Sequence, residues 1–475
     1  MFDDDWNDED FAGSLDTLLI QYQALKKGEA DRFWDEQEFE LIIDYFFQNG
    51  QESEALIACE LALIHHPFSS EFLLLKAELL FQAQKYRQAL SALDELDAKE
   101  QIQLDSVVLR SDILVAQYKF DQAVAHLEKM SLIFSGKEQI DILLELAEVY
   151  DECEELDAVF DTLKRILKID PNCEEALHKI CYWTDFAEKQ EESIVLHQEI
   201  IDAFPYNALA WFNLGSAYQG LKMYEKAIDA YEFCLAIDDK FEIAYRNIAE
   251  AYIRLKWYDK AIESLEKNLE LGKPEDVIFE AIGHCFEKKN NYAKARQYYT
   301  EAVKLNPTDD GIYFKIGKTY VKEQAWEKAM RQFAKAYELD KENVQYCLAL
   351  GDCMLELHDG PEAVAFYIAA IKIRPSHKKS WLSLIKALYL FGYYAEALEQ
   401  LRESENFFNR NAEFKYYESL ILFAQGKSKE AMLILEDALE SDPRKFKLIE
   451  TLKPELLQRN AVMELVAKYI KSKKS

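Results

Sequence analysis

The stretch WFNLGSAYQGLKMYEKAIDAYEFCLAID, residues 211–238, decides the fold of this chain, because its pattern returns as YRNIAEAYIRLKWYDKAIESLEKNLELG, residues 245–272. The two copies set a period of 34. In both copies large apolar residues stand three or four positions apart, which is the spacing of one face of a helix. A fixed period of this length is typical of arrays in which each unit packs only on its neighbours. The sequence therefore predicts a helical repeat array.

When the chain is laid out with one period per row, similar residues fall into columns. The first predicted helix of each row carries an aromatic residue, then leucine or isoleucine, then glycine or alanine, as in Trp211, Leu214 and Gly215. The second has alanine at positions 227, 261, 295, 329, 363, 397 and 431. We interpret these small residues as places where two helix backbones approach closely, since a larger side chain would overpack there. The aromatic or leucine column that follows, as in Tyr231, is expected to fill the seam to the next row.

The prolines keep the same register. Five of the nine stand whole periods apart, namely Pro171, Pro205, Pro307, Pro375 and Pro443. A proline ends a helix because the residue before it is pushed out of the α region. Pro67 precedes Pro171 by three periods plus two positions, which predicts a two-residue insertion near residues 133–139.

These columns resemble the tetratricopeptide repeat, whose pattern is seen here in Trp211, Leu214, Gly215, Tyr218, Ala227, Tyr231 and the proline position. The resemblance implies an all-α, right-handed superhelical solenoid of about twelve helix pairs with C-terminal capping helices. In this family the first helices of the pairs line a concave groove that accepts an extended peptide or a partner helix, and the resemblance implies the same here.

The period divides the chain into four segments. Residues 1–13 are an acidic tail, too charged to pack and expected to be disordered. Residues 14–35 are expected to form an N-terminal helix or cap, residues 36–445 the array of about twelve repeats, and residues 446–475 the capping helices and a basic tail. We also hypothesise that the acidic tail docks on basic residues of the groove, in the same chain or in a second copy.

Composition limits the partners and the location. The chain has 87 acidic and 56 basic residues and a formal charge of -31, so neither nucleic acid nor an anionic membrane is an expected partner. Eight cysteines without a CxxC pair suggest reduced thiols in the cytoplasm. The acidic start lacks the pattern of a secretory signal. The most apolar stretch, residues 381–394, is interrupted by Lys386 and is too short to cross a bilayer.

The sequence shows no catalytic signature. No P-loop, GxGxxG, HExxH or GxSxG motif is present, and the eight histidines lack metal-ligand spacing. We therefore expect no catalytic, metal or cofactor site, and we interpret the chain as a non-enzymatic scaffold or adaptor that binds proteins. One alternative is a dedicated chaperone or regulatory subunit for a single client. A more remote alternative is an enzyme that uses groove residues such as His284 with Glu250.

By analogy with the family, the inward-facing columns predict two binding surfaces. The basic groove residues combine cations, amides and a ring, a mixture suited to a peptide backbone and a carboxylate: Asn213, Arg246, Asn247, Arg254, His284, Lys288, Phe314, Lys315, Lys318 and Lys322. The acidic groove residues are Asp44, Glu78, Asp112, Asp141, Glu145, Glu148 and Glu152. The last four of these share one helical face, where like charges should destabilise the fold unless a cation binds.

Overall fold

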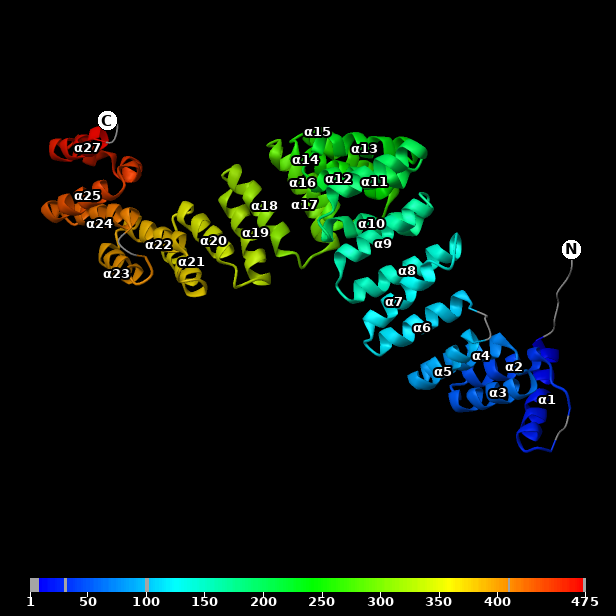
Figure 1. Cartoon of the computed structure of the whole chain (residues 1–475). Coiled ribbons are helices and arrows are strands. Elements are labelled where there is room, and N and C mark those ends of the chain that lie inside the picture. The colour runs from blue at the N-terminus through cyan, green and yellow to red at the C-terminus, as the bar shows by residue number, and fades with distance from the viewer. Residues whose placement is uncertain (1–7, 30–31, 99–101, 409–410, 473–475) are drawn as a thin grey trace. The chain divides into compact units, whose positions relative to one another are not determined.

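The computed structural model describes residues 8–29, 32–98, 102–408 and 411–472. Within these ranges the chain forms 27 α-helices and two short 3-10 segments, and it contains no strand (Figure 1). Successive helices pack in pairs, from α2 with α3 to α24 with α25. The predicted all-α solenoid of about twelve helix pairs is confirmed.

The helices fall into two compact units, which we describe separately. Unit 1 comprises residues 1–241 and holds the first six pairs. Its helices are α1 (Asp8–Lys26), α2 (Glu36–Gln48), α3 (Glu52–His65), α4 (Ser70–Gln82), α5 (Tyr86–Asp97), α6 (Leu104–Ala116), α7 (Phe120–Ser131), α8 (Lys137–Glu152), α9 (Leu156–Ile169), α10 (Glu174–Phe186), α11 (Gln190–Ala203), α12 (Ala208–Gly220) and α13 (Tyr224–Ile237).

Unit 2 comprises residues 242–475 and holds the other six pairs and the C-terminal helices. Its elements are α14 (Glu242–Arg254), α15 (Tyr258–Leu271), α16 (Asp276–Lys288), α17 (Tyr292–Leu305), α18 (Asp310–Lys322), α19 (Trp326–Leu339), α20 (Val344–Glu356), α21 (Gly360–Ile373), α22 (Lys378–Leu390), α23 (Tyr394–Ser404), α24 (Ala412–Ala424), α25 (Ser428–Ser441), η1 (Pro443–Phe446), α26 (Lys447–Leu452), η2 (Pro454–Gln458) and α27 (Asn460–Ser472).

Every pair turns at one residue with positive φ. In the pair α12 and α13 this residue is Lys222, and the next amide, that of Met223, donates a 2.9 Å hydrogen bond to the carbonyl of Tyr218. This bond satisfies a carbonyl at the helix end, as in a Schellman motif. The turn residues have φ between 53° and 80°, and three of the twelve are glycine: Gly50, Gln84, Tyr118, Glu154, Glu188, Lys222, Lys256, Asn290, Gln324, His358, Gly392 and Gly426.

The turn residues locate the irregularity in the repeat. They stand one period apart throughout, except between Tyr118 and Glu154, where the spacing is two positions longer. Between these two turns α7 has 12 residues and α8 has 16, and Gly136 stands between them with φ of 64°. The two-residue insertion is therefore confirmed in the predicted region.

The glycine column has a different cause from the predicted one. A Cβ atom at Gly215 would lie 2.6 Å from Cδ1 of Tyr231, and at Gly351 it would lie 2.6 Å from Cε1 of Tyr367. The nearest obstacle is thus the aromatic ring of the second helix in the same pair, not the backbone of that helix. The ring packs against the first helix of its own pair, and Phe333 of this column also shares a core with Leu350 and Cys353 of the next pair, as the predicted seam requires.

The helix before the array begins earlier than predicted. Helix α1 starts at Asp8, six residues before the expected start at Ser14, so residues 8–13 are helical instead of disordered. Acidic residues favour a helix N-terminus, and the sequence supplies three at positions 8–10. Tyr22 of α1 is fully buried in the core that α2 and α3 form. Residues 1–7, the rest of the acidic tail, lie outside the described residues.

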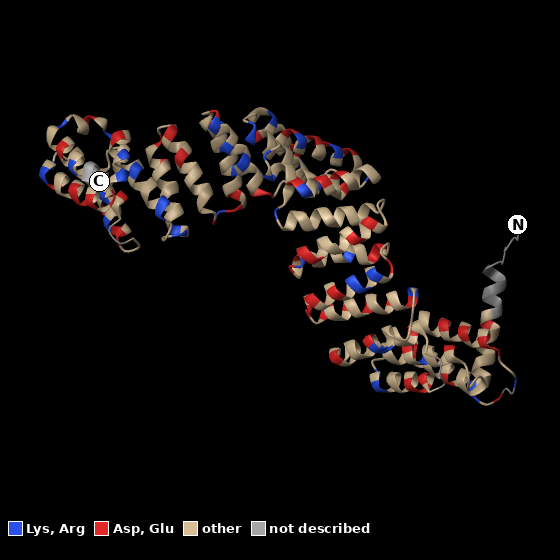
Figure 2. Cartoon of the chain, turned by 45° about the horizontal axis from the view of Figure 1, so that its top comes forward, with Lys and Arg blue, Asp and Glu red and all other residues tan. Residues whose placement is uncertain are grey.

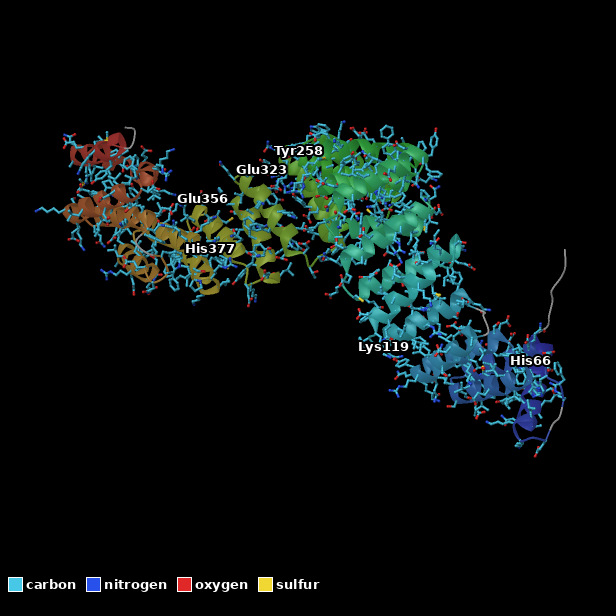
Figure 3. All side chains as sticks on the ribbon, viewed as in Figure 1. His66, Lys119, Tyr258, Glu323, Glu356 and His377 are labelled. Atoms are coloured by element: carbon cyan, nitrogen blue, oxygen red, sulfur yellow. The ribbon has the colours of Figure 1, made fainter. Side chains whose placement is uncertain are left out.

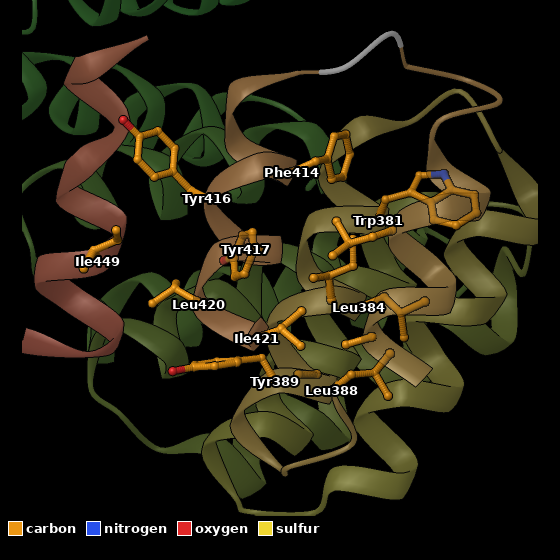
Figure 4. Close-up of a cluster of buried hydrophobic side chains, with 14 of the residues drawn as sticks. Trp381, Leu384, Leu388, Tyr389, Phe414, Tyr416, Tyr417, Leu420, Ile421 and Ile449 are labelled. Atoms are coloured by element: carbon orange, nitrogen blue, oxygen red, sulfur yellow. The ribbon is translucent and has the colours of Figure 1, made fainter. Parts of the chain in front are cut away.

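The C-terminal helices complete the core of unit 2. Figure 4 shows Ile449 on its helix beside Tyr416, Tyr417 and Leu420 of α24. Ile449 is completely buried, and Val462 of α27 is 1% exposed in the same core. The segment after the last repeat therefore covers the apolar side of α24 and α25, as capping helices are expected to do.

Candidate functional site

The basic groove residues of unit 2 lie on the first helices of consecutive pairs. His284 and Lys288 belong to α16, and Phe314, Lys315, Lys318 and Lys322 belong to α18. His284 is half-buried, and burial together with the charges of Lys288 and Lys315 lowers its pKa. The side chains of Lys288 and Lys315 are therefore electrostatic neighbours of His284.

Three of the predicted cations already have acidic partners. Lys315 forms an ion pair with Glu280 of α16. Arg254 contacts Glu250 on its own helix at 3.0 Å, and Arg246 lies 3.7 Å from Glu275. Such pairs reduce the charge that these residues offer to a partner.

Three other lysines remain uncompensated. Lys288, Lys318 and Lys322 are exposed and have no ion pair within the part of the chain that the structure describes. Glu323 stands next to Lys322 at the end of α18 (Figure 3), but it is engaged by Arg296 of α17 at 3.0 Å. We call Lys288, Lys318 and Lys322 the basic face. In Figure 2 basic and acidic positions are interspersed along the helices, so this surplus is local.

A pocket of about 190 Å³ lies beside the basic face. Phe314 and Val321 of α18, with Leu348 and Ala349 of α20, form an apolar wall, and the Lys318 ammonium lies 5.6 Å from the centre of the Phe314 ring. The polar lining residues are Lys318, Gln345, Asp352 and Lys379. We call this the α18–α20 pocket.

Sequence reasoning missed part of this lining. Asp352 stands one period after Lys318, and Lys379 stands one period after Gln345. Both belong to columns of the same repeat, and continuing those columns past Lys318 would have found them. The Asp352 carboxylate accepts a 2.7 Å hydrogen bond from the hydroxyl of Tyr367, so it is held in place by the second helix of its pair.

Asn213 and Asn247 do not join the basic face. Asn213 belongs to unit 1 and is only 1% exposed, and its Nδ2 donates a 2.7 Å hydrogen bond to the Leu177 carbonyl. The same Nδ2 lies 3.2 Å from Nε2 of the buried His197. Asn213 therefore supports the fold, which corrects its predicted contact with a partner. Asn247 is half-buried, and its side chain makes no hydrogen bond within the described residues.

Only some of the acidic groove residues come together. Burial, followed by the charges of Asp112 and Glu148, raises the pKa of Glu145 to about 7. The pKa of Asp112 is also raised, by burial and then by Glu148 and Glu152. Glu148 has a cationic partner, Lys179 of α10, at 2.9 Å.

The remaining acidic groove residues stand apart from this cluster. Burial and the charge of Asp105 raise the pKa of Glu78, and burial, followed by the charges of Glu71 and Asp44, raises the pKa of Glu40. Asp141 is not among the charges that act on Glu145, although both belong to α8. The predicted acidic surface therefore reduces to Asp112, Glu145, Glu148 and Glu152.

The described residues were also searched for a metal site, a membrane-spanning helix and the surroundings of His284. Among them no group of three or more histidine, cysteine, aspartate or glutamate side chains could hold a metal ion. No described helix has both the length and the apolar character that crossing a bilayer requires. The charges of Lys288, Glu287, Lys315 and Glu280 act on His284.

Comparison with known families identifies the repeat. Tetratricopeptide repeat models match residues 208–241, 244–271 and 280–309. A model of the anaphase-promoting complex, cyclosome, subunit 3 matches residues 48–130. No curated protein matches the sequence.

Several solved structures are similar to this chain. The C-terminal part of a TPR repeat-containing protein from Cytophaga hutchinsonii is 19% identical, with a TM-score of 0.43, over 51% of this chain and 99% of that part. The APC/C hetero-tetramer Cut9–Hcn1 is 12% identical, with a TM-score of 0.34, over 85% of this chain and 98% of its own. YrrB, a TPR protein with an unusual peptide-binding site, is 23% identical, with a TM-score of 0.35, over 39% of this chain and 95% of its own.

The residue columns, the twelve helix pairs and the matching repeat models agree with one another. The segments that these models match are tetratricopeptide repeats, and the helix pairs on either side of them follow the same helix–turn–helix pattern.

Proposed function

We propose that the chain is a non-enzymatic scaffold or adaptor that binds an extended acidic peptide, or an acidic segment of a partner protein, on the basic face of unit 2. The observation that carries this proposal is the α18–α20 pocket, which sets an apolar wall beside Lys318. An apolar side chain of a bound segment would fill the pocket, and a neighbouring carboxylate would reach Lys318 or Lys322.

The chemistry of the face favours binding over catalysis. A peptide gains affinity from an apolar anchor in a pocket, while surrounding charges set its specificity and its association rate. Lys288, Lys318 and Lys322 are exposed cations in a chain whose formal charge is -31. An acidic partner would meet attraction at this face and repulsion over much of the remaining surface.

The test is affinity capture from native lysate with the wild type, the K318E/K322E variant and the control K372E/K429E. Lys372 and Lys429 are exposed lysines on the second helices α21 and α25, so the control makes the same charge change elsewhere. We expect the wild type and the control to capture the same partner, and K318E/K322E to lose it at low salt. Equal capture by all three proteins would contradict the proposal.

A second candidate is a dedicated chaperone or regulatory subunit for a single client. The match of residues 48–130 to a model of one subunit of a larger assembly favours it. A scaffold is expected to return several partners at varying stoichiometry, whereas a dedicated subunit returns one partner at a fixed ratio. Mass measurement of the captured complex by light scattering distinguishes the two.

We also propose a cytoplasmic location. All eight cysteines are free thiols, and burial raises the pKa of most of them, for example that of Cys285 to about 12. Buried thiols of this kind stay protonated and act as small apolar residues. Unpaired cysteines in such number are typical of a reducing compartment.

A further inference from the structure

A second pocket, of about 570 Å³, opens where the C-terminal helices meet the last repeats of unit 2. We call it the C-terminal pocket. Lys386 of α22, Glu413 and Tyr417 of α24, Asp442 and the residues of η1 and α26 line it, and Figure 4 shows Tyr417 between the helix of Ile449 and Leu384 of α22. It is larger than the α18–α20 pocket and none of the basic groove residues contributes to it.

Positive charge exceeds negative charge in this pocket. Lys386, Arg444, Lys445 and Lys447 supply four cations against the carboxylates of Glu413 and Asp442. The whole chain has the opposite imbalance, with 87 acidic and 56 basic residues. A local surplus of cations is therefore not explained by composition.

Both carboxylates are already neutralised. Burial opposes the ionisation of Glu413, but hydrogen bonds from Lys378 and Lys445 outweigh it and lower the pKa of Glu413. The Lys445 Nζ lies 2.5 Å from Oε1 of Glu413. Asp442 accepts a 3.1 Å hydrogen bond from Nε of Arg444, which lowers its pKa. Glu413 and Asp442 are therefore not available as counter-charges for Lys386 and Lys447.

Lys386 and Lys447 have no ion pair among the described residues. Lys447 is exposed, but Lys386 is half-buried on a helix that is otherwise strongly apolar, between Leu384 and Leu388 in sequence. A cation without a counter-charge beside an apolar surface attracts an anion. Beside these cations Tyr417, Leu448 and Leu452 offer an apolar wall.

The C-terminal pocket and the α18–α20 pocket share one helix. Lys379 lines the α18–α20 pocket and Lys386 lines the C-terminal pocket, and the two lysines stand seven positions apart on α22. Residues at this spacing lie two turns apart on one face, about 10 Å along the axis. An extended chain covers about 10 Å with three residues, so one segment can reach both pockets.

We propose that the C-terminal pocket binds an acidic peptide segment of a partner, with an aromatic or aliphatic side chain against Leu448, Leu452 and Tyr417 and carboxylates at Lys386 and Lys447. This inference rests on the proposed function, because it names a second contact for the same class of partner. A polyphosphate or nucleic acid is disfavoured, since the chain as a whole repels a dense anion.

The test uses a fluorescein-labelled peptide of stated chemistry, MFDDDWNDEDFA, which is the sequence of residues 1–12 and sets three aromatic residues among acidic ones. Its anisotropy is measured with the full chain at low salt. We expect K386E/K447E to weaken binding about tenfold or more relative to K372E/K429E, with the difference shrinking at high salt. The single exposed change K447E should weaken binding about threefold, which keeps the test open if K386E disturbs the fold.

Other outcomes overturn the inference. One is equal affinity of K386E/K447E and K372E/K429E. Another is equal binding of a peptide in which every acidic residue is replaced by its amide. A third is displacement of the probe by millimolar inorganic phosphate, which would mark a simple anion site. K318E/K322E separates the two proposals, because a partner lost with that variant and kept with K386E/K447E would leave the proposed function standing while this inference falls.

Discussion

Gly283 lies against the ring of Tyr299, so that a Cβ atom at Gly283 would stand 2.6 Å from Cδ1 of that ring. The ring is completely buried, and its hydroxyl donates a 2.8 Å hydrogen bond to Oε2 of Glu287, so it cannot withdraw from a larger neighbour. In the preceding pair the equivalent positions hold Ala249 and Leu265. Each tyrosine or phenylalanine at this position of the second helix is accompanied by a glycine in the first helix.

We expect Gly283→Ala to destabilise the α16 and α17 pair by about 1–3 kcal/mol through overpacking. Hydrogen exchange of the amides in these helices measures the local effect, since an array of this length need not unfold in one step. Adding Tyr299→Leu, which recreates the Ala249 and Leu265 combination, should make the glycine substitution less costly than it is beside tyrosine. Strictly additive effects would show that the ring is not the obstacle.

Glu145 makes the stability of unit 1 depend on pH. Its folded pKa of about 7 lies above its ordinary value of 4.5, so the folded state holds its proton more tightly. Stability from this group is therefore complete below about pH 4.5 and is lost as the pH rises through 7. We expect Glu145→Gln to stabilise the α6 and α8 region by about 1–2 kcal/mol at pH 8 and to have little effect at pH 4.

Hydrogen exchange at the two pH values checks this prediction. Glu138→Gln, at an exposed position on the same helix, is the matched control. A stabilisation of equal size at both pH values, or one that Glu138→Gln reproduces, would contradict the assigned cause.

Asn213 should act on stability and not on binding. We expect Asn213→Ala to destabilise unit 1 by about 1–3 kcal/mol, because the Leu177 carbonyl and His197 lose a buried partner. Asn247→Ala, one period later at a half-buried site, should change stability by about 0.5 kcal/mol or less. Neither change should alter the affinity of an acidic peptide for unit 2. Weaker peptide binding by Asn213→Ala with unchanged stability would restore its predicted place in the groove.

The lysines of α18 should not contribute equally. Lys315 is neutralised by Glu280, so Lys315→Gln should alter acidic-peptide affinity about twofold or less, as is typical of an ion-paired residue. Lys318→Gln with Lys322→Gln should weaken it about fivefold or more at low salt, and raising the salt should remove most of the difference. Titration of both variants with a labelled acidic peptide at two salt concentrations measures these affinities. An equal loss of affinity in Lys315→Gln would show that the ion pair of Lys315 with Glu280 opens on binding.

The sequence was sufficient for the fold, because the packing columns repeat and each pair contacts mainly its neighbours. The small residue at Gly215 was visible, but its cause was not, since spacing alone does not show whether a ring or a backbone faces it. The insertion before α8 was found because proline and turn positions share one register.

The site was less accessible to sequence reasoning. Column position shows which way a side chain points, but not whether a neighbour already binds it. Lys315 and Lys318 stand three positions apart on one helix, yet only Lys315 meets a carboxylate, and that carboxylate comes from another pair. The burial of Asn213 does not follow from its column, because it depends on His197, which stands where most other rows carry tyrosine, phenylalanine or leucine and whose Nε2 lies 3.2 Å from the Asn213 amide.

The positive-φ turns have a consequence for engineering. Nine of the twelve turn residues are not glycine, among them Lys222, Lys256 and Gln324. The left-handed conformation costs a side-chain-bearing residue about 1 kcal/mol, a penalty that glycine avoids at some cost in backbone entropy. Because such a turn occurs in every repeat, the array could be stabilised stepwise by replacing these residues with glycine, one turn at a time. Such replacements would change no core contact and no residue of the basic face.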